Sequence, residues 1–126
     1  MTKQRLATLS ASFGAGLLFL TAGLHLSGYS TVVSPAQADL KPLMAAASVA
    51  VGASLILAAL LAIAATPLFM VRRRVLLWIA ALTPLSIALL QIAYLGFLPP
   101  TALLILDAAV LVLAGELGRA DQPRPA

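Results

Sequence analysis

The chain has 126 residues, of which 62% are hydrophobic and 10% charged, and its mean hydropathy is +1.06. Soluble domains carry about 25% charged residues, so this composition cannot fold around one apolar core in water and predicts an integral membrane protein. A spanning helix needs roughly 20 residues. The length therefore allows four spans with short connections and leaves no room for a soluble catalytic domain.

Four apolar runs predict four transmembrane helices, which we expect to pack as an antiparallel, all-α bundle in a single membrane domain. The predicted spans cover residues 6–26, 43–66, 75–95 and 101–117, and residues 118–126 form a short polar tail. Gly, Pro and Ser pairs of the kind that stop helices lie between the runs, as in Ser27-Gly28, Thr66-Pro67 and Pro99-Pro100.

The basic residues gather on one side of this predicted bundle. Three groups lie there, and Lys41 alone lies on the other side; the groups are Lys3 with Arg5, then Arg72, Arg73 and Arg74, and finally Arg119 with Arg124. Cytoplasmic loops of membrane proteins carry an excess of Lys and Arg. We therefore expect a multi-pass protein of the cytoplasmic (inner) membrane with both termini inside, and we interpret the three adjacent arginines as topology signals.

The N-terminal run also resembles a secretory signal peptide, because Ala36-Gln37-Ala38 has the A-x-A form of a cleavage site. The apolar run is about 20 residues long, however, whereas the hydrophobic region of a signal peptide has roughly 7–15. The Ala-Gln-Ala motif also lies well beyond the end of this run. We expect the segment to remain as the first span.

Small and polar residues indicate which side of a span contacts other helices, because lipid tails are as apolar as leucine and leave close packing and polar contacts to hold helices together. At about 100° per residue, three spans each show one such side. These sides are Ser48, Gly52, Ala59, Ala62 and Thr66 in the second span; Ala80, Pro84, Ala88 and Gln91 in the third; and Asp107, Ala114 and Gly118 in the fourth. We expect Pro84 to kink its helix.

The first span carries small or polar residues on two sides. Gly14, Thr21 and His25 line one side, and Ser12, Gly16 and Gly23 line nearly the opposite one. Such a helix either sits centrally or uses a second interface. The partners expected here are the lipid bilayer together with other membrane subunits or further copies of the chain.

Asp107 is the one charged residue that lies inside an apolar run. Counting inward at ~1.5 Å per residue places Gln91, Thr21 and Ser48 at a similar depth, with His25 and Tyr94 nearer the outer surface. We expect these six side chains to form one outward-opening polar cluster. An acid at the centre of a span costs about 2.5–3.5 kcal/mol, and no Lys or Arg lies at this depth, so we expect a neutral or hydrated carboxyl rather than an ion pair.

The remaining polar residues indicate interfaces. His25 is expected to be an interfacial residue or a helix cap, Trp78 an interfacial anchor, and Glu116 an interfacial residue able to pair with Arg119.

No recognisable chemistry follows from the other residues. The chain has no cysteine, one histidine and four acids, so we expect no metal site and no cofactor. It has no catalytic motif and no basic stripe with interleaved aromatics, so neither an enzyme nor a nucleic-acid partner is expected.

In size and span number the chain resembles the small multidrug resistance transporters, which also have four short helices and one essential membrane acid. That family carries its glutamate in the first helix, whereas residues 6–26 contain no acid, so no site residue is carried over. We expect a non-enzymatic accessory, assembly or self-associating membrane protein in which Asp107 fixes packing. The alternative is a small proton-coupled transporter that uses Asp107, with protons or small molecules as substrates; third is a lipid- or quinone-binding module or enzyme.

Overall fold

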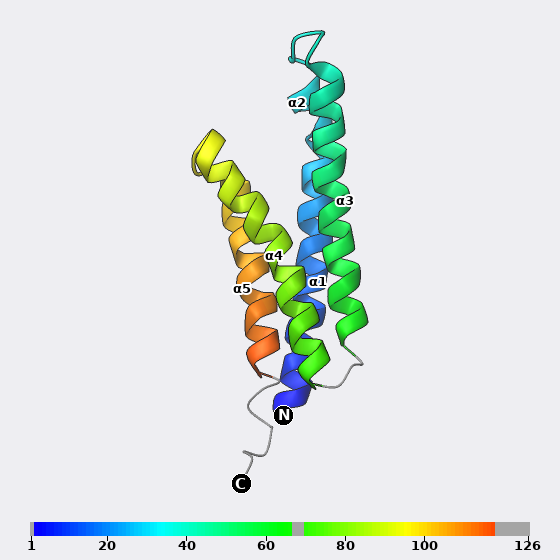
Figure 1. The fold of residues 1–126 in the computed structure, drawn as a ribbon, viewed down its shortest axis with the longest axis vertical. Helices are drawn as coiled ribbons and strands as arrows, with labels where there is room; N and C mark the ends of the chain where they lie inside the picture. The colour runs from blue at the N-terminus through cyan, green and yellow to red at the C-terminus, as the bar shows by residue number, and fades with distance from the viewer. Residues whose placement is uncertain (1, 67–69, 118–126) are drawn as a thin grey trace.

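The computed structural model describes residues 2–66 and 70–117. These residues form four long helices and one short one (Figure 1): α1 (Lys3–Ser27), α2 (Tyr29–Val33), α3 (Lys41–Ala65), α4 (Met70–Leu95) and α5 (Pro99–Leu117). All four long helices are long and apolar enough to cross a membrane, which confirms the predicted number of spans. The short helix α2 was not predicted; Arg119, Arg124, Gly118 and the polar tail lie outside the described residues.

The four long helices pack as an antiparallel bundle in which α1 contacts α3 and α5, and α4 contacts the same two helices. The beginning of α1 and the end of α5 lie together at what we call the terminal end (Figure 1). At the opposite, loop end, α2 packs beside α1 and α3. The α4–α5 pair diverges from the α1–α3 pair toward this loop end (Figure 1).

Local sequence sets where the helices begin and turn. Thr2 caps α1, since its side chain accepts a hydrogen bond from the Arg5 N–H at 3.4 Å. Gly96 has φ +79°, a left-handed conformation that glycine adopts without steric cost. The Thr101 side chain accepts a hydrogen bond from the Leu98 N–H at 3.3 Å, as the side chain at the third helical position (N3) does in a capping box. These contacts make a tight connection between α4 and α5.

The interior of the bundle consists mostly of alanine. Leu18, Leu55, Leu77 and Leu111 are the large aliphatic side chains that are fully buried. Around them lie the buried alanines, including Ala11, Ala15, Ala59, Ala62, Ala80, Ala88 and Ala114. Large apolar residues such as Leu43 and Leu57 are exposed on the outside, where lipid would contact them. Pro84 lies within α4 and is buried.

Two glycines allow close approach between helices. A Cβ atom on Gly14 would lie 2.8 Å from Leu111 Cδ2 and 3.2 Å from Val110 Cγ1, so a side chain on α1 there would displace these side chains of α5. A Cβ atom on Gly52 would lie 2.6 Å from Leu26 Cδ2. By contrast, a Cβ atom on Gly16 would meet no atom within 4 Å.

Gly14→Val should therefore destabilise the bundle by about 1–3 kcal/mol relative to Gly16→Val, because only the former overpacks the interior. The two substitutions share the same helix and the same change of helix propensity, so their difference isolates packing. Denaturation of both variants in detergent, followed by circular dichroism at a dilution that keeps the chain monomeric, measures it. Equal stabilities would contradict the α1–α5 contact.

Candidate functional site

Asp107 lies in the contact between α1 and α5 and is 0% exposed. Its Oδ2 atom is 2.9 Å from Thr21 Oγ1 in α1, and Thr21 Oγ1 is also 3.0 Å from the backbone oxygen of Leu17. The other carboxyl oxygen, Oδ1, is buried and has no hydrogen-bond partner among the described residues. The acid is thus buried and held by one neighbouring hydroxyl.

Gln91 has a different partner. The Thr101 hydroxyl donates to Gln91 Oε1 at 2.9 Å, so this amide ties α4 to α5 near the tight connection. Thr101 is fully buried, although it was not among the site residues expected from the sequence. Its position two residues after Pro99, as the back-bonding residue of the α5 cap, is the signal that could have indicated it.

His25 and Ser48 form the third contact, between α1 and α3. His25 Nε2 lies 3.1 Å from the Ser48 backbone oxygen and 3.4 Å from its side-chain oxygen. A backbone oxygen can only accept, so Nε2 carries the hydrogen and donates. This donation makes His25 a link between two helices at the loop end.

The expected site residues thus take part in three helix contacts. Thr21 and Asp107 join α1 to α5, His25 and Ser48 join α1 to α3, and Gln91 joins Thr101. Tyr94 takes part in none of these contacts, and its side chain is 82% exposed.

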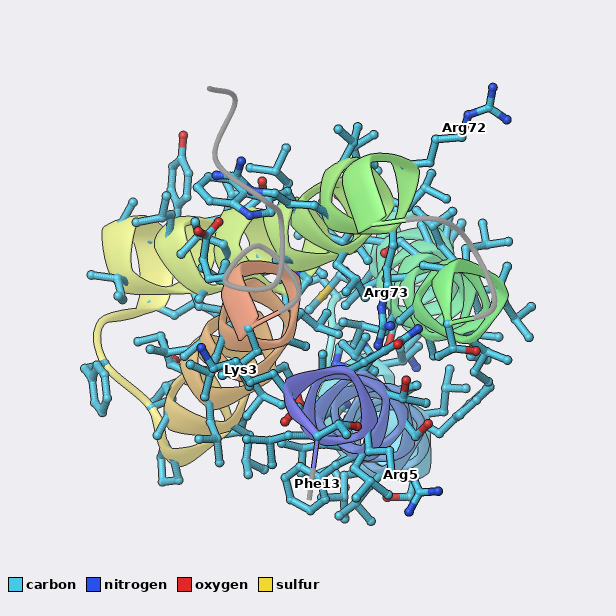
Figure 2. The ribbon with its side chains drawn as sticks, turned by 90° about the horizontal axis from the view of Figure 1, so that it is seen from below. Lys3, Arg5, Phe13, Arg72 and Arg73 are labelled. Carbon is cyan, nitrogen blue, oxygen red and sulfur yellow. The ribbon has the colours of Figure 1, made fainter. Side chains whose placement is uncertain are left out.

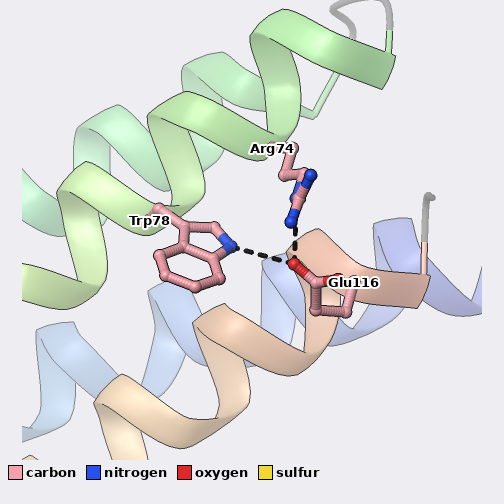
Figure 3. Close-up of polar contacts among 3 residues, drawn as sticks. All are labelled: Arg74, Trp78 and Glu116. Carbon is pink, nitrogen blue, oxygen red and sulfur yellow. Dashed lines mark hydrogen bonds and ion pairs between the residues drawn. The ribbon is translucent and has the colours of Figure 1, made fainter.

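At the terminal end, α4 and α5 are joined by a charged contact (Figure 3). Arg74 Nε donates to Glu116 Oε1 at 2.9 Å, and Trp78 Nε1 donates to the same oxygen at 3.2 Å. The Arg74 guanidinium carbon lies 5.8 Å from the Trp78 ring centroid, which is within cation–π range. Both charged side chains are more than a third exposed, so the ion pair contributes at most about 1 kcal/mol. Arg119, the partner expected from the sequence, lies outside the described residues.

The three adjacent arginines have different surroundings. Arg72 points away from the bundle, whereas Arg73 points in among the helices (Figure 2) and is only 4% exposed. Arg73 Nη2 donates to Thr8 Oγ1 at 3.0 Å, while its buried Nε has no partner in the described part of the chain. Arg73 and Arg74 thus make structural contacts besides any role in topology.

Within residues 2–66 and 70–117, no group of three His, Cys, Asp or Glu side chains could hold a metal ion. The surface hollow at the start of α1 is lined by Thr2, Gln4, Arg5, Thr8 and Leu9, at the other end of that helix from Thr21. No known protein family, curated protein or solved structure matches the chain.

The residues Ser12, Gly14, Gly16, Gly23 and Gly52, which the sequence places at helix contacts, separate into two sets. Gly14 faces α5, and Gly52 in α3 faces Leu26 of α1. Ser12, Gly16 and Gly23 are exposed, and a Cβ atom on either glycine would meet no atom within 4 Å. Because α1 contacts the bundle along one side, its second small-residue side lies outside the packed core.

Thr8→Val should destabilise the fold by about 1–3 kcal/mol, because it leaves the buried Arg73 guanidinium without this acceptor. Thr8→Ser keeps the hydroxyl and should stay close to the parent chain. Denaturation in detergent compares the two variants. If Thr8→Val were as stable as Thr8→Ser, the contact with Arg73 would carry no stabilisation.

Proposed function

We propose that this protein is a non-enzymatic membrane protein that associates through its first helix, and that the partner bound there is a second copy of the chain. The observation that carries the proposal is the exposed outer side of α1, with its open spaces over Gly16 and Gly23. We call the residues of this side the α1 outer face: Leu9, Ser12, Gly16, Phe19 and Gly23.

The α1 outer face is continuous along the helix. Its residues follow one another at alternating spacings of three and four, and all five are exposed. This spacing keeps side chains in one line, as in helices that pack along their length. The neighbouring Phe13 points away from the bundle (Figure 2) and is 61% exposed.

Glycine at Gly16 and Gly23 needs an explanation outside the bundle. A glycine costs a helix about 1 kcal/mol relative to alanine, and the open space at both positions means that the intramolecular packing does not require it. Small residues let the backbones of transmembrane helices approach closely. A second helix against this face would make use of both glycines.

The chemistry of the face favours a second copy as that helix. It carries no charge, and Ser12 is its one polar side chain, so it suits an apolar helix that also offers small residues. The face itself has this composition. Two copies inserted with the same topology place Gly16 at the same depth, so that an isologous contact needs no adjustment of register.

A proton-coupled carrier is the second candidate, favoured by the acid at Asp107. The structure lends it less support, since the carboxyl is 0% exposed and hydrogen-bonded to Thr21.

For orientation, we propose that both termini and residues 72–74 face the cytoplasm, on the strength of the basic residues at the terminal end. The chain has no cysteine, so labelling of a single introduced cysteine shows on which side of the membrane that position lies. Gln4 and Gln37 are both exposed and lie at opposite ends of the bundle. In intact cells a membrane-impermeant maleimide should label Gln37→Cys, whereas Gln4→Cys should react only after permeabilisation. The reverse pattern would establish the opposite orientation.

Self-association is tested by cross-linking in native membranes. Oxidation should convert much of Ser12→Cys into a disulfide-linked dimer, while Leu57→Cys, which is exposed on α3, should give several-fold less. Adding Gly16→Leu to Ser12→Cys should reduce dimer formation several-fold, because the larger side chain separates the two helices.

Two results would overturn this assignment. Equal cross-linking at Ser12→Cys and Leu57→Cys would indicate random collision, and capture of a different protein at Ser12→Cys would identify another occupant of the α1 outer face. Gly16→Leu should leave the helicity of the detergent-solubilised chain unchanged, since a Cβ atom at this exposed position would meet no atom within 4 Å.

A further inference from the structure

The hydroxyl of Thr21 has one hydrogen but two neighbouring oxygens that could receive it. Asp107 Oδ2 is 2.9 Å away, and the backbone oxygen of Leu17 is 3.0 Å away. Both distances are those of hydrogen bonds. A threonine hydroxyl also has lone pairs and can accept a hydrogen while it donates its own. The protonation state of Asp107 decides which arrangement holds.

An ionised Asp107 would be poorly stabilised in this position. The Thr21 hydroxyl would then donate to Oδ2, and this would be the single donor to a charge that is 0% exposed. The Oδ1 atom would remain a buried, unpartnered half of the anion. A buried charge without a paired ion costs several kcal/mol, and in the described residues the ion pair is made by Arg74 with Glu116 at the terminal end.

A neutral Asp107 satisfies the same geometry. With a proton on Oδ2, the carboxyl O–H donates to Thr21 Oγ1, and the Thr21 O–H donates to the backbone oxygen of Leu17. Both short distances then correspond to hydrogen bonds, and Oδ1 becomes an uncharged carbonyl oxygen, which is less costly to bury without a partner than an anion. We infer that Asp107 is a proton-binding site, at which a bound proton joins α5 to α1 through Thr21 and Leu17.

No other titratable group in the described residues competes for this proton. On α1, the nearest is His25, one turn beyond Thr21, and its Nε2 is engaged with Ser48 of α3. On α4, Arg73 is held by Thr8, and Arg74 by Glu116 of α5. Among the described residues, the Thr21 hydroxyl is the hydrogen-bond partner of the acid, and a proton is the ligand that this arrangement suits.

This inference does not rest on the proposed self-association, because Asp107 faces the interior and the α1 outer face lies on the other side of α1. It makes the α1–α5 contact depend on the protonation of Asp107. Loss of the proton would place an uncompensated charge between two helices that otherwise meet through Gly14, Leu111 and alanines. The proton is thus a structural ligand of the bundle.

Infrared spectroscopy of the full chain in lipid tests the site directly. At neutral pH, where an exposed aspartate is ionised, the wild-type chain should show the carbonyl stretch of a protonated carboxyl. That band should disappear in Asp107→Asn and persist in Asp39→Asn, whose parent residue is exposed. A wild-type spectrum without the band, or a band that survives in Asp107→Asn, would overturn the proposal.

The role of Thr21 has its own readout. In Thr21→Val the carboxyl O–H of Asp107 loses its acceptor, the Thr21 hydroxyl oxygen, so the carbonyl band should move to higher frequency. In Thr21→Ser the hydroxyl is kept, and the band should stay at the wild-type position. An unshifted band in Thr21→Val would show that the proton does not bind Thr21. Since the wild-type spectrum alone reports the protonation state, the proposal stays testable even if a variant fails to fold.

Discussion

The packing of this protein depends on the absence of a hydrophobic force between helices in lipid. A leucine gains little by leaving lipid for the interior of a bundle, so helices associate through close backbone contact and polar bonds. The chain meets this constraint by filling the interior mostly with alanine and exposing many of its leucines. Gly52 and Gly14 show this most clearly, since a Cβ atom there would lie 2.6 Å from the Leu26 side chain and 2.8 Å from the Leu111 side chain, respectively. Dispersion contacts of these closely packed atoms then replace the missing hydrophobic force.

Polar bonds fix what close packing leaves free, namely which helix lies beside which and at what register. The α4–α5 pair is tied at both ends, by Gln91 with Thr101 and by Arg74 with Glu116. Helix α1 has polar bonds to all three other long helices, through Thr21 to α5, through His25 to α3 and through Thr8 to Arg73 of α4. A few specific bonds suffice because each spans two helices that already pack closely.

The number of spans and their buried sides can be predicted from the sequence more readily than the polar contacts between helices. Span number follows from hydropathy, and the buried sides of α3 and α4 follow from small residues at helical spacing, because both signals are local. Contacts across the tight Gly96 connection are also accessible in principle, since residues equally far from a hairpin turn face each other, as Gln91 and Thr101 do. The Thr21–Asp107 bond is not accessible in this way, because nothing local says that α1 lies beside α5. The five-residue helix α2 is too short for periodicity to indicate it.

The two sides of α1 use small residues in different ways. At Gly14 the space that a side chain would take is occupied by Leu111 of the same bundle, so packing within one chain explains the glycine. At Gly16, two positions further along, the space remains open. The glycine therefore lowers helix stability there without allowing a closer contact inside the bundle. A bundle held only by its own interior would gain from alanine there. The glycine fits the proposed contact with a second copy, in which small residues on the outer side of α1 allow close helix packing, as Gly14 does on the inner side.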